Sequence, residues 1–101
     1  MSDKITIDQC LDFLGIESTP EINDMVASMV DGIYSSLYVS TGYDQDKTYI
    51  SKVENLANTI VKLELYNDFN NQNIRTDRIS YLIKQLQVMM CADGIEVNTE
   101  A

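Results

Sequence analysis

The chain has 101 residues, 45% of them hydrophobic, and a formal net charge of −9. This length suits a single domain, and the hydrophobic content is well above that of disordered chains. An acidic chain repels phosphate groups, so the charge argues against ordinary binding to nucleic acid or to anionic membranes. Four glycines and one proline enforce few turns, which favours a small number of long helices.

The charge is unevenly distributed along the chain. Residues 1–46 carry nine acids against one base, a net charge of −8. Residues 47–92 carry six bases and four acids (+2), and residues 93–101 carry three acids and no base (−3). The acidic front of one copy and the mildly basic rear of another could therefore meet head to side. A solvated acidic face is the alternative explanation.

The residue types exclude much of enzyme chemistry. The chain has no histidine, and its two cysteines, Cys10 and Cys91, are expected to be free thiols in a reducing cytosol. It contains no nucleophile elbow, zinc-binding helix motif, phosphate-binding loop or dinucleotide fingerprint. We therefore expect no catalytic residue, no metal site and no cofactor. No secretory signal or apolar stretch of about 18 residues is present, so we expect a soluble, cytoplasmic protein without a membrane span.

Local signals predict a first helix over about residues 7–14. Thr6 is a good N-cap, and Gln9 completes a capping box in which two side chains satisfy free backbone amides. Gly15 is expected to end this helix, with Ile16 folding back as in a Schellman motif.

A second helix is predicted over about residues 20–41. Thr19 is the expected cap, Pro20 suits the first helical position, and Gly42 ends the helix. Gly32 lies inside it at a cost of about 1 kcal/mol relative to Ala. This glycine either packs closely against a neighbour or is simply tolerated. One apolar stripe runs along the helix: Ile22, Met25, Val26, Met29, Val30, Ile33 and Leu37.

Two further helices follow. The third is predicted over about residues 47–68 with Asp46 as its cap, and an asparagine-rich stretch ends it. The fourth is predicted over about residues 77–91 with Thr76 as its cap. Their apolar stripes are Ile50, Val53, Ala57, Ile60, Val61 and Leu65, and Ile79, Leu82, Ile83, Leu86 and Met90.

The last residues differ from the helices. In residues 94–101, Ile95 and Val97 alternate with polar residues, which is compatible with an extended tail or with a disordered terminus. We therefore predict a single domain over residues 1–101. Its fold class is all-α: a short helix, two long helices, a fourth helix and an extended C-terminal tail.

The acidic turn after the second helix resembles part of a calcium loop. Asp44, Asp46 and Thr48 match ligand positions one, three and five. However, Tyr49 stands where the loop needs glycine, and Asn55 stands where a bidentate glutamate is required. We therefore do not predict a calcium site.

The tyrosines suggest a surface for protein contacts. Tyr38 and Val39 lie off the main apolar stripe, and Tyr43 follows closely. Tyrosine is enriched at protein interfaces, so these three residues are candidates for contact with a neighbouring subunit. Tyrosines at the edge of a core, with their hydroxyls in water, are the alternative explanation.

Several segments together resemble the phage head–tail connector (adaptor) family. The cap and short helix at residues 5–8 and 11–16 are similar to that family's opening Thr-x-acid and Leu-x-x-Leu-x-Ile segments. The end of the second helix, residues 40–43, resembles its Tyr/Thr-Gly ending. Residues 66–68 and 79–86 resemble its Tyr-Asn segment and its closing Leu-rich helix. The resemblance covers about residues 5–90.

The resemblance implies a structural virion protein that forms a ring, usually dodecameric. Such a ring joins the portal vertex of the capsid to the tail and extends the DNA channel. The implied partners are the portal protein, other copies of the chain, and a tail-side stopper or tail-completion protein. DNA would pass through without specific binding. The implied location is the head–tail interface of the virion, after assembly in the host cytoplasm.

Candidate residues follow from this role. For neighbouring subunits we expect contact through Tyr38, Val39 and Tyr43, and for the channel we expect Asp44 and Asp46. The C-terminal segment is the expected portal contact: Gly94, Ile95, Glu96, Val97, Asn98, Thr99, Glu100 and Ala101.

Two other interpretations stay open at this point. The acidic charge would also suit a small helical regulatory protein, such as an inhibitor that mimics DNA, although the second half of the chain is mildly basic. The second open interpretation is a plain helical scaffold domain that forms no ring.

Overall fold

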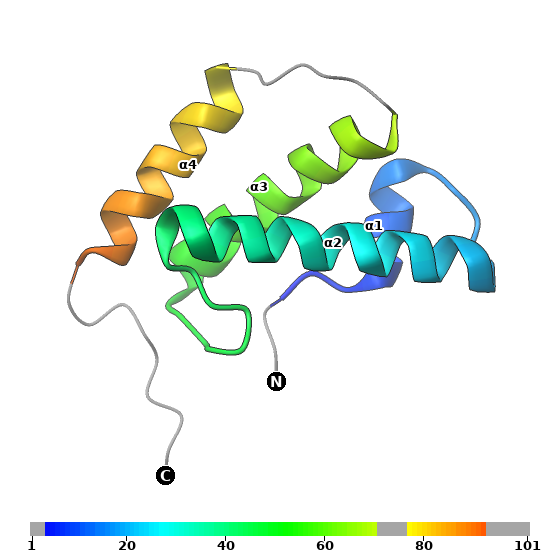
Figure 1. The fold of residues 1–101 in the computed structure, drawn as a ribbon, viewed down its shortest axis with the longest axis horizontal. Coiled ribbons are helices and arrows are strands. Elements are labelled where there is room, and N and C mark those ends of the chain that lie inside the picture. The colour runs from blue at the N-terminus through cyan, green and yellow to red at the C-terminus, as the bar shows by residue number, and fades with distance from the viewer. Residues whose placement is uncertain (1–3, 71–76, 93–101) are drawn as a thin grey trace, which may run out of the picture.

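A computed structural model describes residues 4–70 and 77–92 of the chain. These residues form four helices and no strand: α1 (Ile7–Leu14), α2 (Pro20–Thr41), α3 (Ser51–Phe69) and α4 (Asp77–Met90) (Figure 1). The predicted all-α fold class is confirmed, with one short helix, two long ones and a fourth. The predicted extended tail, residues 94–101, lies outside the described residues.

The capping residues of α1 act as the sequence predicts. The backbone amide of Gln9 donates to the Thr6 hydroxyl at 3.1 Å, and the Gln9 side chain accepts from the Thr6 amide at 2.9 Å. At the other end, Gly15 has a φ of 71°, and the Ile16 amide donates to the Leu11 carbonyl at 3.1 Å. The capping box and the Schellman ending are both confirmed.

The boundaries of α2 are also confirmed. The Ile22 amide donates to the Thr19 hydroxyl at 3.1 Å, and Pro20 occupies the first helical position. Gly42 ends the helix in the left-handed region, with a φ of 85°, and its amide donates to the Tyr38 carbonyl. Two local signals therefore set the length of the longest helix.

The start of α3 differs from the prediction. Asp46 does not cap this helix, which begins at Ser51 instead of residue 47, and its N-cap, Ile50, makes no side-chain hydrogen bond. The Asp46 amide instead donates to the Asp44 carboxylate at 2.9 Å, forming a local turn. The following residues stay non-helical because Tyr49 is buried and its amide donates to the side chain of Glu54 at 2.9 Å.

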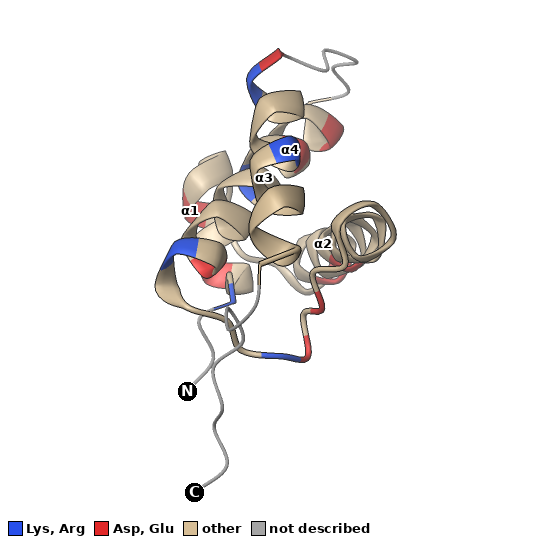
Figure 2. Cartoon of the chain, turned by 90° about the vertical axis from the view of Figure 1, so that its left-hand side faces the viewer, with Lys and Arg blue, Asp and Glu red and all other residues tan. Residues whose placement is uncertain are grey.

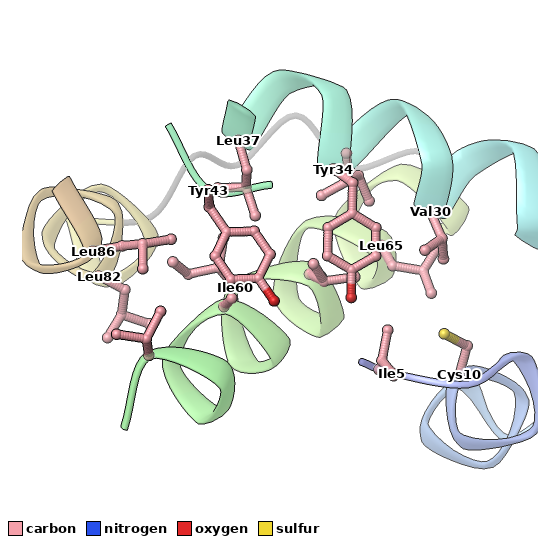
Figure 3. Close-up of a cluster of buried hydrophobic side chains, with 14 of the residues drawn as sticks. Ile5, Cys10, Val30, Tyr34, Leu37, Tyr43, Ile60, Leu65, Leu82 and Leu86 are labelled. Carbon is pink, nitrogen blue, oxygen red and sulfur yellow. The ribbon is translucent and has the colours of Figure 1, made fainter. Parts of the chain in front are cut away.

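The helices pack around α3, which contacts α1, α2 and α4 (Figure 1). Figure 3 shows side chains from α1, α2, α3 and α4 meeting in one cluster, with the Tyr34 and Tyr43 rings between α2 and α3. The cluster consists of Ile5, Cys10, Leu11, Val26, Val30, Ile33, Tyr34, Leu37, Tyr43, Tyr49, Val53, Ala57, Ile60, Val61, Leu65, Leu82 and Leu86.

The two cysteines have different environments. Cys10 is buried in the core, whereas Cys91 is exposed beyond the end of α4, and both are free thiols. Burial raises the pKa of the Cys10 thiol, although the charge of Lys62 opposes this. Cys10 therefore behaves as a small apolar core residue. Within residues 4–70 and 77–92, no helix is both long and apolar enough to cross a bilayer.

Two glycines give opposite predictions for stability. A methyl group added at Gly32 or at Gly42 would meet no atom within 4 Å, so only the backbone conformation matters. We expect Gly42→Ala to lower the free energy of unfolding by about 1 to 2 kcal/mol, because alanine is strained at positive φ. We expect Gly32→Ala to raise it by about 1 kcal/mol, because alanine is the better helix former. Urea denaturation measures both. A loss of stability in Gly32→Ala would show that this glycine is needed within the subunit.

Candidate functional site

Glu54, on the first turns of α3, is buried at 1% exposure and joins three segments of the chain. One carboxylate oxygen accepts hydrogen bonds from the Lys4 ammonium at 2.6 Å and from the Tyr49 amide at 2.9 Å. The other oxygen accepts a short hydrogen bond from the Tyr43 hydroxyl. Lys4 also donates to the carbonyl of Lys47 at 2.5 Å. The N-terminal segment and the loop at residues 42–50 are thus tied to α3 by one carboxylate.

Aromatic rings enclose this ion pair. Tyr43 and Tyr49 have ring centroids 5.1 Å apart, and the Lys4 ammonium lies 5.1 Å and 5.6 Å from their centroids. Tyr34 of α2 stacks on Tyr43 with centroids 6.1 Å apart. Cation–π attraction and stacking add to the hydrogen bonds. The loop at residues 42–50 is therefore held rigidly against α2 and α3.

The first candidate surface lies where α2 meets this loop. Tyr38 and Val39 expose 58% and 86% of their surface on α2. They border a shallow depression of about 390 Å³, together with Asp44 and Asp46. We call this the α2-loop surface, and its lining is Tyr34, Ser35, Tyr38, Val39, Asp44, Gln45 and Asp46.

Hydrogen bonds fix the loop side of that surface. The Asp44 amide donates to the Tyr49 hydroxyl at 3.2 Å, and Gln45 donates to the carboxylate of Asp31 on α2 at 3.3 Å. The surface therefore combines exposed apolar side chains from a helix with carboxylates on a fixed loop.

The second candidate surface lies on the outer face of α4. Tyr81 and Val88 expose 60% and 71% of their surface, seven residues apart on the helix. They border a largely apolar depression of about 430 Å³. Its lining is Tyr81, Lys84, Gln85, Val88 and Met89, which we call the α4 surface. The opposite face of this helix holds the buried Ile79, Leu82 and Leu86, so the exposed face is firmly supported.

The predicted contact residues differ in their exposure. Tyr38 and Val39 are exposed, as contact with a neighbour requires. The assignment of Tyr43 to a subunit contact is wrong in this fold, because its ring is 0% exposed and its hydroxyl donates to Glu54. Asp44 and Asp46 lie on the α2-loop surface, and their role in a channel stays a prediction. The predicted portal contact, residues 94–101, lies outside the described residues.

Sequence reasoning missed both Glu54 and the α4 surface. Glu54 lies four residues after Ile50 and three before Ala57, so its position on the apolar face of the third helix was a readable signal. Tyr81 and Val88 share the face opposite the apolar stripe of the fourth helix, which was also readable. Lys4 could not be found in this way, because its partner is 50 residues away.

The chain was also compared with known proteins. No protein family, no curated protein and no solved structure matches it. The resemblance of its motifs to head–tail connectors therefore stays a prediction.

The buried ion pair gives a direct stability prediction. We expect Glu54→Gln to lower the free energy of unfolding by about 3 kcal/mol, because it leaves the Lys4 ammonium without its carboxylate. Glu64→Gln, on the same helix and only half-buried, is the matched control and should change stability by less than about 0.5 kcal/mol. Adding Lys4→Met to Glu54→Gln should restore part of the loss. Equal urea midpoints for Glu54→Gln and Glu64→Gln would contradict the anchoring role.

Two buried tyrosines predict loss of stability in alkali. Burial raises the pKa of the Tyr34 hydroxyl from 10.0 to about 12. Burial, and then the hydrogen bond to Glu54, also raises the pKa of Tyr43. The unfolded chain loses these protons near pH 10, whereas the folded chain retains them. The contribution of these two tyrosines to the free energy of unfolding is therefore fully present below pH 10 and is lost as the pH rises above it.

Urea denaturation across this alkaline range measures the effect. The rise in the pKa of Tyr34 alone corresponds to a loss of about 3 kcal/mol in the free energy of unfolding once both states are ionised. We expect Tyr34→Phe to make the decline shallower, and Tyr81→Phe, on an exposed ring, to leave it unchanged. An identical decline in Tyr34→Phe and Tyr81→Phe would show that Tyr34 does not contribute.

Proposed function

We propose that this chain is a structural subunit that assembles with copies of itself into a ring, as a head–tail connector of a phage does. The observation that carries the proposal is the presence of two surfaces with exposed apolar side chains on one small subunit, the α2-loop surface and the α4 surface. The order of the sequence motifs that resemble the connector family supports the same role.

Exposed apolar surface of this kind favours a partner. Tyr38, Val39, Tyr81 and Val88 each expose more than half of their surface. Isolated exposed side chains are common, but here each pair borders a depression. Tyrosine is among the residues enriched where protein interfaces carry their binding energy. Covering these surfaces with another protein would bury them.

A ring needs two different surfaces on each subunit. A contact between unlike surfaces repeats from copy to copy, and it closes into a ring when the rotation between neighbours allows. The α2-loop surface and the α4 surface lie on different helices and differ in their side chains, so each subunit offers two unlike surfaces. In this role the ring would bind the portal protein on one side and a stopper or tail-completion protein on the other.

The acidic front of the chain has a use in such a ring. Exposed carboxylates on α1 and α2 include Asp8, Asp12, Glu21, Asp24 and Asp31. Negative charge along a channel repels the phosphates of DNA and allows the duplex to slide without specific binding. We propose that this acidic half lies toward the channel, at the head–tail interface of the virion.

The size of the protein in solution tests the proposal. We expect light-scattering chromatography of the full chain to show a mass that rises with concentration toward a closed ring, visible by negative-stain electron microscopy. Mixing with purified phage portal rings should move the chain into the portal peak. A monomer at every concentration that also ignores portal rings would contradict the proposal. Binding to DNA-binding proteins by that monomer would favour the DNA-mimicking inhibitor instead.

A further inference from the structure

We infer that the α4 surface of one copy docks on the α2-loop surface of the next copy. The inference deepens the proposed function and rests on it, since it names the two surfaces that the repeating contact uses. It is carried by the charges on these surfaces, their apolar side chains and the way that the core holds each of them.

The charges of the two surfaces are complementary. Asp44 and Asp46 line the α2-loop surface, which contains no basic residue in its lining. Lys84 lines the α4 surface, which contains no acidic residue in its lining. Arg78 lies one turn before Tyr81 on the same exposed side, while Asp77 offsets part of the positive charge at the start of the helix. Figure 2 shows basic positions on α4, and on the loop that follows α2 it shows acidic positions and one basic position, since Lys47 follows Asp46.

The same charges disfavour a contact between identical surfaces. Two α2-loop surfaces placed face to face would bring Asp44 and Asp46 of both copies together. Two α4 surfaces would bring the Lys84 side chains together. Juxtaposed like charges oppose binding, whereas the unlike pair attracts and also steers the encounter. The charges therefore select a head-to-tail contact over a two-fold dimer.

The apolar side chains and their supports fit such a contact. Tyr81 and Val88 of one copy would cover Tyr38 and Val39 of the next, excluding water from both depressions. Neither surface needs to be ordered first. The α2-loop surface is held by the bonds to Glu54, and the α4 surface is part of a helix packed on the core. Surfaces that are already ordered lose less conformational entropy on binding.

One consequence concerns the acids assigned to the channel. In this arrangement Asp44 and Asp46 lie at the boundary between subunits and not on the channel wall. The acids exposed on α1 and on the earlier turns of α2 would then supply the negative channel surface.

Charge reversal on each surface tests the inference. We expect Asp46→Lys and Lys84→Glu each to weaken self-association of the full chain by roughly tenfold, because each creates like charges across the contact. Asp46 is suitable because its side chain is exposed. Glu17→Lys and Lys62→Glu are matched controls, since they change the net charge equally but lie outside both surfaces. Sedimentation velocity gives the association, and circular dichroism checks that each variant is folded.

Mixing the two variants gives the decisive result. In a head-to-tail contact, the reversed loop of Asp46→Lys matches the reversed helix of Lys84→Glu, and the other two surfaces are unchanged. The mixture should therefore associate about as tightly as the wild-type chain, and roughly tenfold more tightly than either variant alone. If the wild-type chain assembles and both single variants assemble equally well, the inference is overturned and the proposed ring stays intact. A wild-type chain that stays monomeric even with portal rings would overturn the proposed function itself.

Discussion

The carboxylate of Glu54 accepts hydrogen bonds from the Lys4 side chain, the Tyr43 hydroxyl and the Tyr49 amide. It therefore fixes one segment that precedes α2 in the chain and one that follows it. The residues between α2 and α3 would otherwise follow their local preference, which favours a helix capped by Asp46 and beginning near residue 47. Instead they cross the end of the core with Tyr43 and Tyr49 buried. The position of the α2-loop surface depends on this arrangement.

A buried ion pair is a costly way to hold a loop. Removing two charges from water costs several kcal/mol per ion, and well-packed apolar residues of equal volume often stabilise a core as well. Here the carboxylate accepts bonds from three different donors, which recovers much of that cost. The directional bonds also specify one conformation for a loop that apolar contacts alone would restrain less. The result is a defined surface near the end of α2.

Helix α4 carries the second surface, whose charge is opposite to that of the α2-loop surface. The core face of α4 is apolar, and its outer face combines Tyr81 and Val88 with Lys84. One surface combines apolar side chains with acids, and the other combines them with a base. Such a subunit is suited to a head-to-tail contact that repeats from copy to copy. The proposed ring and the inferred head-to-tail contact both follow from this pairing of surfaces, and neither requires a bound ligand or a reactive residue.

The sequence determined the elements whose signals are local. Thr6, Gly15, Thr19 and Gly42 cap or end their helices through bonds that span only a few residues, so capping rules and apolar spacing predicted α1 and α2 correctly. The tertiary structure decided what depends on distant partners. Lys4 meets Glu54 across 50 residues, and the same carboxylate accepts bonds from Tyr43 and Tyr49 in the loop before α3, where Tyr43 is buried while Tyr38 stays exposed. Periodicity could not separate these two tyrosines, because Tyr43 follows the glycine that ends the helix and its burial comes from the packing of α2 on α3.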